Sequence, residues 1–224
     1  MDVTHNNADQ RHDPTGEYER LQELADCYIS TGDYSQAQLC YEKAANLAPD
    51  EPVPYLGLGV VALQEGSLDD AEIAFRVACR LDPGCARAYA GLGMVWQQKG
   101  DYRQAFDMYL KCLEHDTDNL IALLGLFQSS CQMGSFAKVI QYLEVYLSMH
   151  PGDTSVMFPL AALYMKEGSL EKSRKMVCEL LMLDPGHEDA INLLEELDHY
   201  LAEKAQKIAS PAQCAGQVAT GVQG

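Results

Sequence analysis

Residues 55–66 read YLGLGVVALQEG, and residues 89–100, 34 positions later, read YAGLGMVWQQKG. The first copy contains Gly-x-Gly-x-x-Ala from Gly57 to Ala62, a spacing that also occurs in dinucleotide-binding turns. Such a turn needs a strand before the glycines and a helix that begins at them. Here the turn-forming residues 48–54, APDEPVP, precede the glycines, which lie inside an apolar pattern of helical period. We therefore expect no dinucleotide and no other cofactor.

Glycine and leucine recur with the same 34-residue period along most of the chain. A bulky apolar residue stands two positions after each glycine. Self-similarity at such a period indicates stacked supersecondary units. The recurring residues are Gly32, Gly66, Gly100, Gly134 and Gly168; Leu24, Leu58, Leu92, Leu126 and Leu160; and Tyr34, Leu68, Tyr102, Phe136 and Leu170.

Each unit has the pattern of two helices joined by a tight turn. Leu58 and Ala62 are four residues apart on one helical face, and Gly66 can take the left-handed conformation that ends a helix. A second apolar stripe over residues 68–78 predicts a helix that runs back against the first, and Asp-Pro-Gly at 82–84 ends it. Small residues let the two helices approach, and aromatic residues fill the space one turn later: Ala37, Ala71, Ala105, then Tyr41, Phe75 and Tyr109.

These units resemble tetratricopeptide repeats. The third unit matches the family pattern best, and it departs from that pattern only at the last two places, which Cys112 and Thr117 occupy. The resemblance implies an all-α fold, a right-handed α-solenoid (superhelix) of antiparallel helix pairs. The residues that carry it are Tyr89, Leu92, Gly93, Trp96, Gly100, Ala105 and Tyr109.

The repeats define the expected domain organisation. Five repeats cover residues 18–187, and we expect a capping helix over 187–208 with Ile191, Leu194, Leu197 and Leu201 on its packed side. Residues 1–17 and 209–224 have few apolar residues in any periodic pattern, so we expect a disordered arm and a disordered tail. The predicted repeats are 18–51, 52–85, 86–119, 120–153 and 154–187.

The composition argues against several classes of function. The chain has 33 acidic and 16 basic residues, a net charge of −17, which disfavours nucleic acid and anionic lipid as partners. It has no N-terminal apolar run and no stretch long enough to span a membrane, so we expect a cytoplasmic protein. Its eight cysteines include no C-x-x-C pair, which favours reduced thiols. We expect no metal site, although His115, His150 and His187 fall near the ends of successive repeats.

The resemblance also implies where a partner binds, because the first helices of these repeats line the concave side of the superhelix. In the first repeat the corresponding positions are Glu19, Gln22, Asp26 and Ile29. The clamp of Lys, Asn and Arg that co-chaperones of this family use for acidic tails is missing, since only Arg87 is basic. The predicted groove residues are Val53, Leu56, Gly57, Val60, Leu63, Arg87, Met94, Ile121, Leu124, Gln128, Phe158 and Met165.

Gly57, Gly91 and Gly125 recur on the groove side of the first helices, and two interpretations stay open. Either they provide room between neighbouring helices, or they let a bound peptide approach the backbone. Glycine inside a helix costs roughly 0.5–1 kcal/mol relative to alanine, so three in register indicate a compensating gain.

The most direct functional prediction is a non-catalytic scaffold or adaptor for protein–protein interaction. It would bind a partly apolar peptide or helix, flanked by basic residues, in the concave groove. The alternatives are a chaperone-like shield for hydrophobic segments of exported or assembling subunits, and a scaffold that assembles with its own copies. An enzyme acting through Cys131 would need a base and an orienting group, and no histidine recurs at groove positions.

Overall fold

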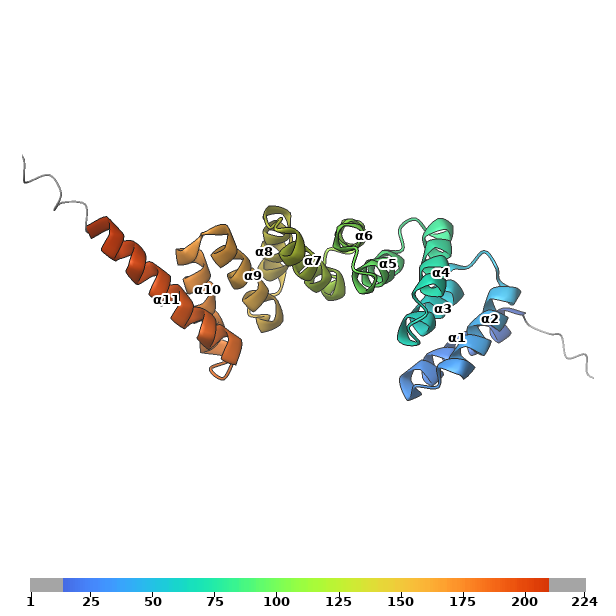
Figure 1. Ribbon diagram of the computed structural model, residues 1–224. Helices are drawn as coiled ribbons and strands as arrows, with labels where there is room; N and C mark the ends of the chain where they lie inside the picture. The colour runs from blue at the N-terminus through green and yellow to red at the C-terminus, as the bar shows by residue number, and fades with distance from the viewer. Residues whose placement is uncertain (1–13, 210–224) are drawn as a thin grey trace, which may run out of the picture. The chain divides into compact units, whose positions relative to one another are not determined.

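The computed structural model describes residues 14–209, which form an all-α helical repeat (Figure 1). Within this range no strand is present, and no helix combines the length and apolarity needed to cross a bilayer. The helices are α1 (Pro14–Thr31), α2 (Tyr34–Leu47), α3 (Pro52–Gln64), α4 (Leu68–Leu81), α5 (Ala86–Gln98), α6 (Tyr102–His115), α7 (Leu120–Met133), α8 (Ala137–Met149), α9 (Thr154–Glu167), α10 (Leu170–Leu183) and α11 (Glu188–Ala209).

The ends of the predicted array need a correction. Helix α1 begins at Pro14, so residues 14–17 are helical, although a disordered arm was expected up to residue 17. Proline suits the first position of a helix because it has no N–H to satisfy there. The rest of the predicted arm, residues 1–13, and the predicted tail from residue 210 lie outside the described residues.

The helices form two compact units, which divide between Met133 and Gly134. In the N-terminal unit, α1 to α7, each helix packs against the next, and the first helices of successive repeats (α1, α3, α5 and α7) also contact one another. In the C-terminal unit, α8 to α11 pack in chain order. The sequence pattern did not predict this division. It falls within the fourth predicted repeat, where Phe127 and Val139 replace the small residues of the second and third repeats.

The periodic glycines end the first helix of each repeat, as the sequence predicted. Each has a positive φ, in the left-handed region that glycine adopts without a steric cost. The φ values are 78° at Gly32, 79° at Gly66, 80° at Gly100, 69° at Gly134 and 86° at Gly168.

The second helix of each repeat in the N-terminal unit places an aromatic ring between first helices. A Cβ built on Gly59 would lie 2.6 Å from the Phe75 ring, and one built on Gly91 would lie 2.5 Å from the same ring. Tyr109 is enclosed in the same way, 2.5 Å from a Cβ on Gly93 and 2.2 Å from one on Gly125. Real Cβ atoms do not come this close, so these positions accept only glycine while the rings keep their places.

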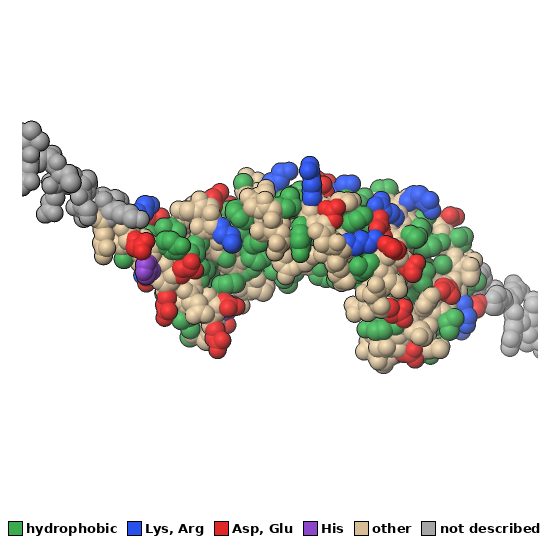
Figure 2. All heavy atoms as spheres, viewed as in Figure 1, with side chains coloured by type: hydrophobic (Ala, Val, Ile, Leu, Met, Phe, Trp, Pro, Cys, Tyr) green, Lys and Arg blue, Asp and Glu red, His purple; other side chains and the backbone are tan. Residues whose placement is uncertain are grey.

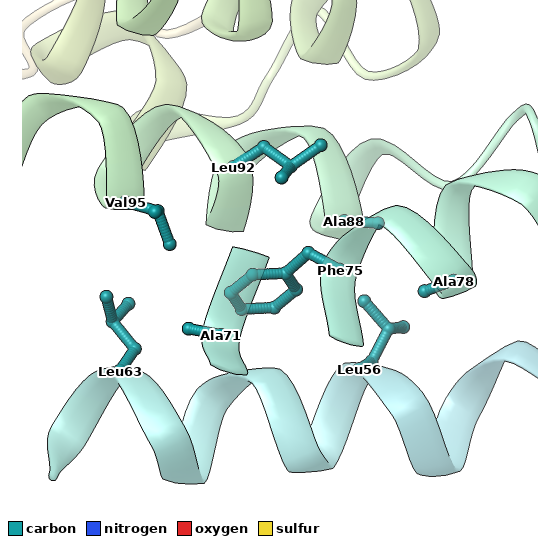
Figure 3. Close-up of a cluster of buried hydrophobic side chains, with 8 residues drawn as sticks. All are labelled: Leu56, Leu63, Ala71, Phe75, Ala78, Ala88, Leu92 and Val95. Carbon is teal, nitrogen blue, oxygen red and sulfur yellow. The ribbon is translucent and has the colours of Figure 1, made fainter. Parts of the chain in front are cut away.

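This geometry decides between the two interpretations of the groove glycines. Gly57 follows the same rule, since its Cβ would lie 2.3 Å from the Tyr41 ring. The protein's own aromatic rings therefore fill the space that these glycines leave. This supports the interpretation that the glycines provide room between neighbouring helices. Around Phe75, three helices contribute to one buried cluster (Figure 3): Leu56 and Leu63 from α3, Ala71 and Ala78 from α4, and Ala88, Leu92 and Val95 from α5.

The C-terminal unit fills its core with different residues. On α10, the smaller Val177 occupies the position of the aromatic ring. On α11, the larger Leu193 occupies the position of a repeat glycine and fills the space that the ring would take. The hydroxyl of buried Ser173 donates to the Ala161 carbonyl at 2.7 Å, which satisfies it inside this core.

Helix α11 covers the end of the C-terminal unit, where the capping helix was predicted. Its buried stripe is Ala190, Leu193 and Leu197, whereas Ile191 is 39% exposed. Of the predicted stripe, Leu197 is buried and Leu194 packs against the same cluster, so only Ile191 lies clearly outside it. Helix α11 contacts both α10 and α9, and Ala190 and Leu193 are buried there. Acidic side chains lie over α11 on the solvent side (Figure 2), as a terminal helix requires.

The aromatic–glycine packing predicts the effect of adding one methyl group. Gly91→Ala should lower the free energy of unfolding by about 1–3 kcal/mol, because overpacking outweighs the gain of about 1 kcal/mol in helix propensity. Phe75→Leu should make the same substitution less harmful, with a coupling of at least about 1 kcal/mol in a double-mutant cycle by urea unfolding. Stabilisation by Gly91→Ala, or additive effects, would contradict the packing.

Two leucines at the same position of the repeat provide a matched comparison. Leu92 is 4% exposed and Leu24 is 44% exposed. Leu92→Ala should lower the free energy of unfolding by about 2–5 kcal/mol because it leaves a cavity. Leu24→Ala should cost less than about 1 kcal/mol. Equal losses in urea unfolding would show that the repeat position, and not burial, determines the cost.

Candidate functional site

The N-terminal unit has a hollow along its first helices with a volume of about 530 Å³. Helices α1, α3 and α5 line it together with the start of α7, and Tyr41 and Phe75 reach it from the second helices. We call it the N-terminal hollow. The predicted groove residues that line it are Val53, Leu56, Gly57, Val60, Leu63, Arg87, Met94 and Ile121.

The remaining predicted groove residues lie elsewhere. Gln128 lines a separate depression beside Gln97 in the same unit, and Leu124 on α7 lines neither hollow. Phe158 and Met165 belong to the C-terminal unit. There the rings of Phe158 and His187 contact each other in a tilted arrangement with centroids 5.1 Å apart, and Met165 lines a hollow of about 410 Å³ next to α11.

The N-terminal hollow has an apolar surface that the core leaves uncovered. Val53 and Val60 are each 36% exposed and Ile121 is 56% exposed. Met94 and Ile29 are half-buried beside them. These five side chains come from four successive first helices, so they form a strip across the unit.

Leu56 and Leu63 have a different role from the one predicted. Both are 7% exposed and belong to the buried cluster around Phe75, in which the side chain of Leu63 points toward Val95 (Figure 3). They line the hollow but belong to the core, because side chains that are only 7% exposed have little area left for a ligand. A charge introduced at Leu56 would therefore disturb the fold as well as the hollow.

The residues of the first helices are polar where they face a tyrosine hydroxyl and apolar near Phe75. Tyr41 donates a hydrogen bond to Asp26 Oδ1, and Tyr109 donates to Gln97 Oε1 at 2.7 Å. Gln97 Nε2 in turn donates to Gln128 Oε1. Phe75 has no hydroxyl, and the second repeat has Val60 and Leu63 at the positions of Asp26 and Gln97. The hollow is consequently apolar at its centre, with a carboxylate beside it on α1.

Burial keeps the two hydroxyls protonated. Burial raises the pKa of Tyr41 well above its usual value of 10.0, and the hydrogen bond to Asp26 raises it further. Burial also raises the pKa of Tyr109, and the nearby Cys112 thiol adds to this effect. Both tyrosines therefore act as donors at neutral pH. The sequence could have indicated this pairing of tyrosine with a polar acceptor. Repeats with Tyr41 or Tyr109 have a polar residue, Asp26 or Gln97, on the first helix, whereas the repeat with Phe75 has apolar residues there.

The thiols and acidic side chains give little sign of chemistry. Burial raises the pKa of Cys79 to about 11 and that of Cys112 to about 12, so both thiols stay protonated at neutral pH and are poor nucleophiles. Among the residues the structure describes, no group of three or more His, Cys, Asp or Glu side chains is arranged to hold a metal ion.

Comparison with known families identifies the repeats. Tetratricopeptide repeat models match residues 23–85 and residues 86–119. Residues 23–119 therefore consist of tetratricopeptide repeats. Proteins of this family are generally scaffolds that bind other proteins. No curated protein sequence matches the chain.

Solved structures of other proteins share this fold over most of the chain. PilF of Pseudomonas aeruginosa is 20% identical, with a TM-score of 0.70 over 88% of this chain and 89% of PilF. YrrB, described as a TPR protein with an unusual peptide-binding site, is 23% identical, with a TM-score of 0.66 over 75% of this chain and 87% of YrrB. PilW, a type IV pilus biogenesis factor, is 21% identical, with a TM-score of 0.66 over 86% of this chain and 93% of PilW. At these identities the likeness concerns the fold.

The buried tyrosines predict a loss of stability in alkali. A folded-state pKa above the unfolded value, about 10 for tyrosine, stabilises the fold below pH 10 and ceases to do so as the pH rises through the folded value. The urea midpoint should therefore fall above pH 10. The Tyr41→Phe, Tyr109→Phe double variant should show a shallower fall than the wild type. Parallel curves for the two proteins would show that these phenols make no such contribution.

Proposed function

We propose that the N-terminal hollow binds a short apolar segment of another protein and that the chain acts as a non-catalytic scaffold or adaptor. The observation that carries this proposal is the exposed apolar strip of Val53, Val60 and Ile121. The packing around Phe75 already uses the neighbouring leucines and glycines, so these three side chains have no role in it. Contact with a partner would remove them from water.

The size of the hollow sets the expected affinity. If a segment covers about 400 Å² of apolar surface, burial contributes roughly 10 kcal/mol at about 25 cal/mol per Å². Association costs about 4–15 kcal/mol, so we expect a Kd of about 40 μM or weaker from this hollow alone. Such affinity suits a reversible adaptor, and the excess of acidic residues favours a basic flank on the bound segment.

Two alternatives use the same apolar strip with a different occupant. A chaperone-like protein would cover a hydrophobic segment of an exported or assembling subunit, and a self-assembling scaffold would receive a second copy of the chain. The cytoplasm stays the predicted location. Peptide binding and self-association can be measured separately.

The test compares two apolar side chains of one unit. A displayed library of random 12-residue peptides is selected on the full chain, and enriched peptides are titrated by fluorescence anisotropy. Val60→Asp should raise the Kd at least tenfold, because a carboxylate would be buried under the ligand. Ile73→Asp should leave it unchanged, since Ile73 is 62% exposed on α4 outside the N-terminal hollow.

Circular dichroism of both variants should match the wild type. Binding that survives Val60→Asp, or that Ile73→Asp also abolishes, would contradict the assignment of the hollow. Dimers in sedimentation that disappear with Val60→Asp would instead indicate a second copy as the occupant.

A further inference from the structure

We propose that Asp26 is the specificity-determining residue of the N-terminal hollow, and that it selects a segment with one Lys or Arg beside its apolar stretch. This inference rests on the proposed function, because it assumes that a segment lies along Val60. It goes further by naming the side chain that binds the basic residue of the segment and the side of the hollow on which this basic residue lies.

The Tyr41 hydroxyl fixes the orientation of the Asp26 carboxylate. Tyr41 is 3% exposed, is held against Gly57, and donates to Asp26 Oδ1. Asp26 itself is exposed and lines the hollow. Within residues 14–209, Oδ2 of Asp26 makes no further hydrogen bond or ion pair. A buried donor therefore holds one carboxylate oxygen and leaves the other available to a ligand.

The position of Asp26 relative to the apolar strip determines what it can recognise. Asp26 and Val60 occupy the same place in successive repeats, on helices α1 and α3, which contact each other. A segment lying on Val60 that continues toward α1 brings its next side chains to Asp26. An ammonium or guanidinium group there forms a charge-assisted hydrogen bond, which is stronger than a neutral one. Because the carboxylate is already oriented, little conformational entropy is lost.

The other charge in the hollow gives the preference a direction. Asp26 and Arg87 are the charged side chains that line the hollow, and Arg87 lies on α5, beyond α3 as seen from α1. The guanidinium of Arg87 is near enough to lower the pKa of Tyr41, in opposition to burial. A basic residue close to Arg87 would be repelled. The complementary segment consequently carries its basic residue at the α1 side and none at the α5 side.

Two substitutions on α1 separate this role from a general charge effect. Asp26→Asn keeps an acceptor for the Tyr41 hydroxyl and removes the charge. Glu23→Gln removes the same charge from an exposed side chain of α1 that does not line the hollow. Asp26→Lys reverses the charge at the proposed site.

The probes are the peptide selected on the wild type and two synthetic versions of it, with Gln or Glu in place of the basic residue. The wild type should prefer the basic peptide over the Gln peptide at least fivefold. Asp26→Asn should abolish this preference, Glu23→Gln should keep it, and Asp26→Lys should favour the Glu peptide. Tyr41→Phe should reduce the preference at least twofold while the Gln peptide keeps its affinity, because Tyr41 only positions the carboxylate.

The outcomes distinguish a failure of this inference from a failure of the proposed function. Equal effects of Asp26→Asn and Glu23→Gln, or selected peptides without a basic residue, would overturn the role of Asp26. If binding also survives Val60→Asp, the proposed function fails. If Val60→Asp abolishes binding while Asp26→Asn keeps the preference, only the present inference fails.

Discussion

An aromatic ring held between glycines of two successive first helices is the constraint on which the N-terminal unit depends. Phe75 contacts the positions of Gly59 and Gly91, and Tyr109 those of Gly93 and Gly125. Each ring thus packs against the first helix of its own repeat and also against the first helix of the next repeat. This explains why glycine appears twice in α3 and twice in α5 despite its cost in helix propensity. The C-terminal unit solves the same packing problem with aliphatic residues on both sides.

The same constraint creates the candidate site. Because the rings and the inward-facing leucines complete the core, the apolar side chains at Val53, Val60 and Ile121 remain in contact with solvent. The rings also determine the polarity of the surface above them. The Tyr41 hydroxyl requires a hydrogen-bond acceptor, which Asp26 supplies on α1. Phe75 has no hydroxyl, so the residues at the centre of the hollow can be apolar. Internal packing therefore specifies both the apolar strip and the carboxylate beside it.

The sequence alone predicted the helix pairs, the left-handed glycines and the aromatic packing, since these depend on local periodicity and backbone conformation. It predicted a groove along the first helices, which stays a prediction, and it did not predict the burial of Leu56 and Leu63. Leu56 and Val60 are both apolar and one turn apart, yet Leu56 is buried in the cluster around Phe75, whereas Val60 is 36% exposed. The burial of Ala190 and Leu193 on α11 was also not predicted, because α11 contacts two helices. The division at Met133 depends on packing that no local pattern reports.

The central claim is that the side chains left uncovered by the aromatic–glycine packing are those that bind a partner. Methyl NMR of the full chain, titrated with an apolar peptide that carries one terminal lysine, measures this directly. The account predicts that the methyl signals of Val60, Met94 and Ile121 shift together and saturate at one peptide per chain, while that of Ile73 does not move. Saturable shifts at Ile73 with unchanged signals at Val60 and Ile121 would contradict it.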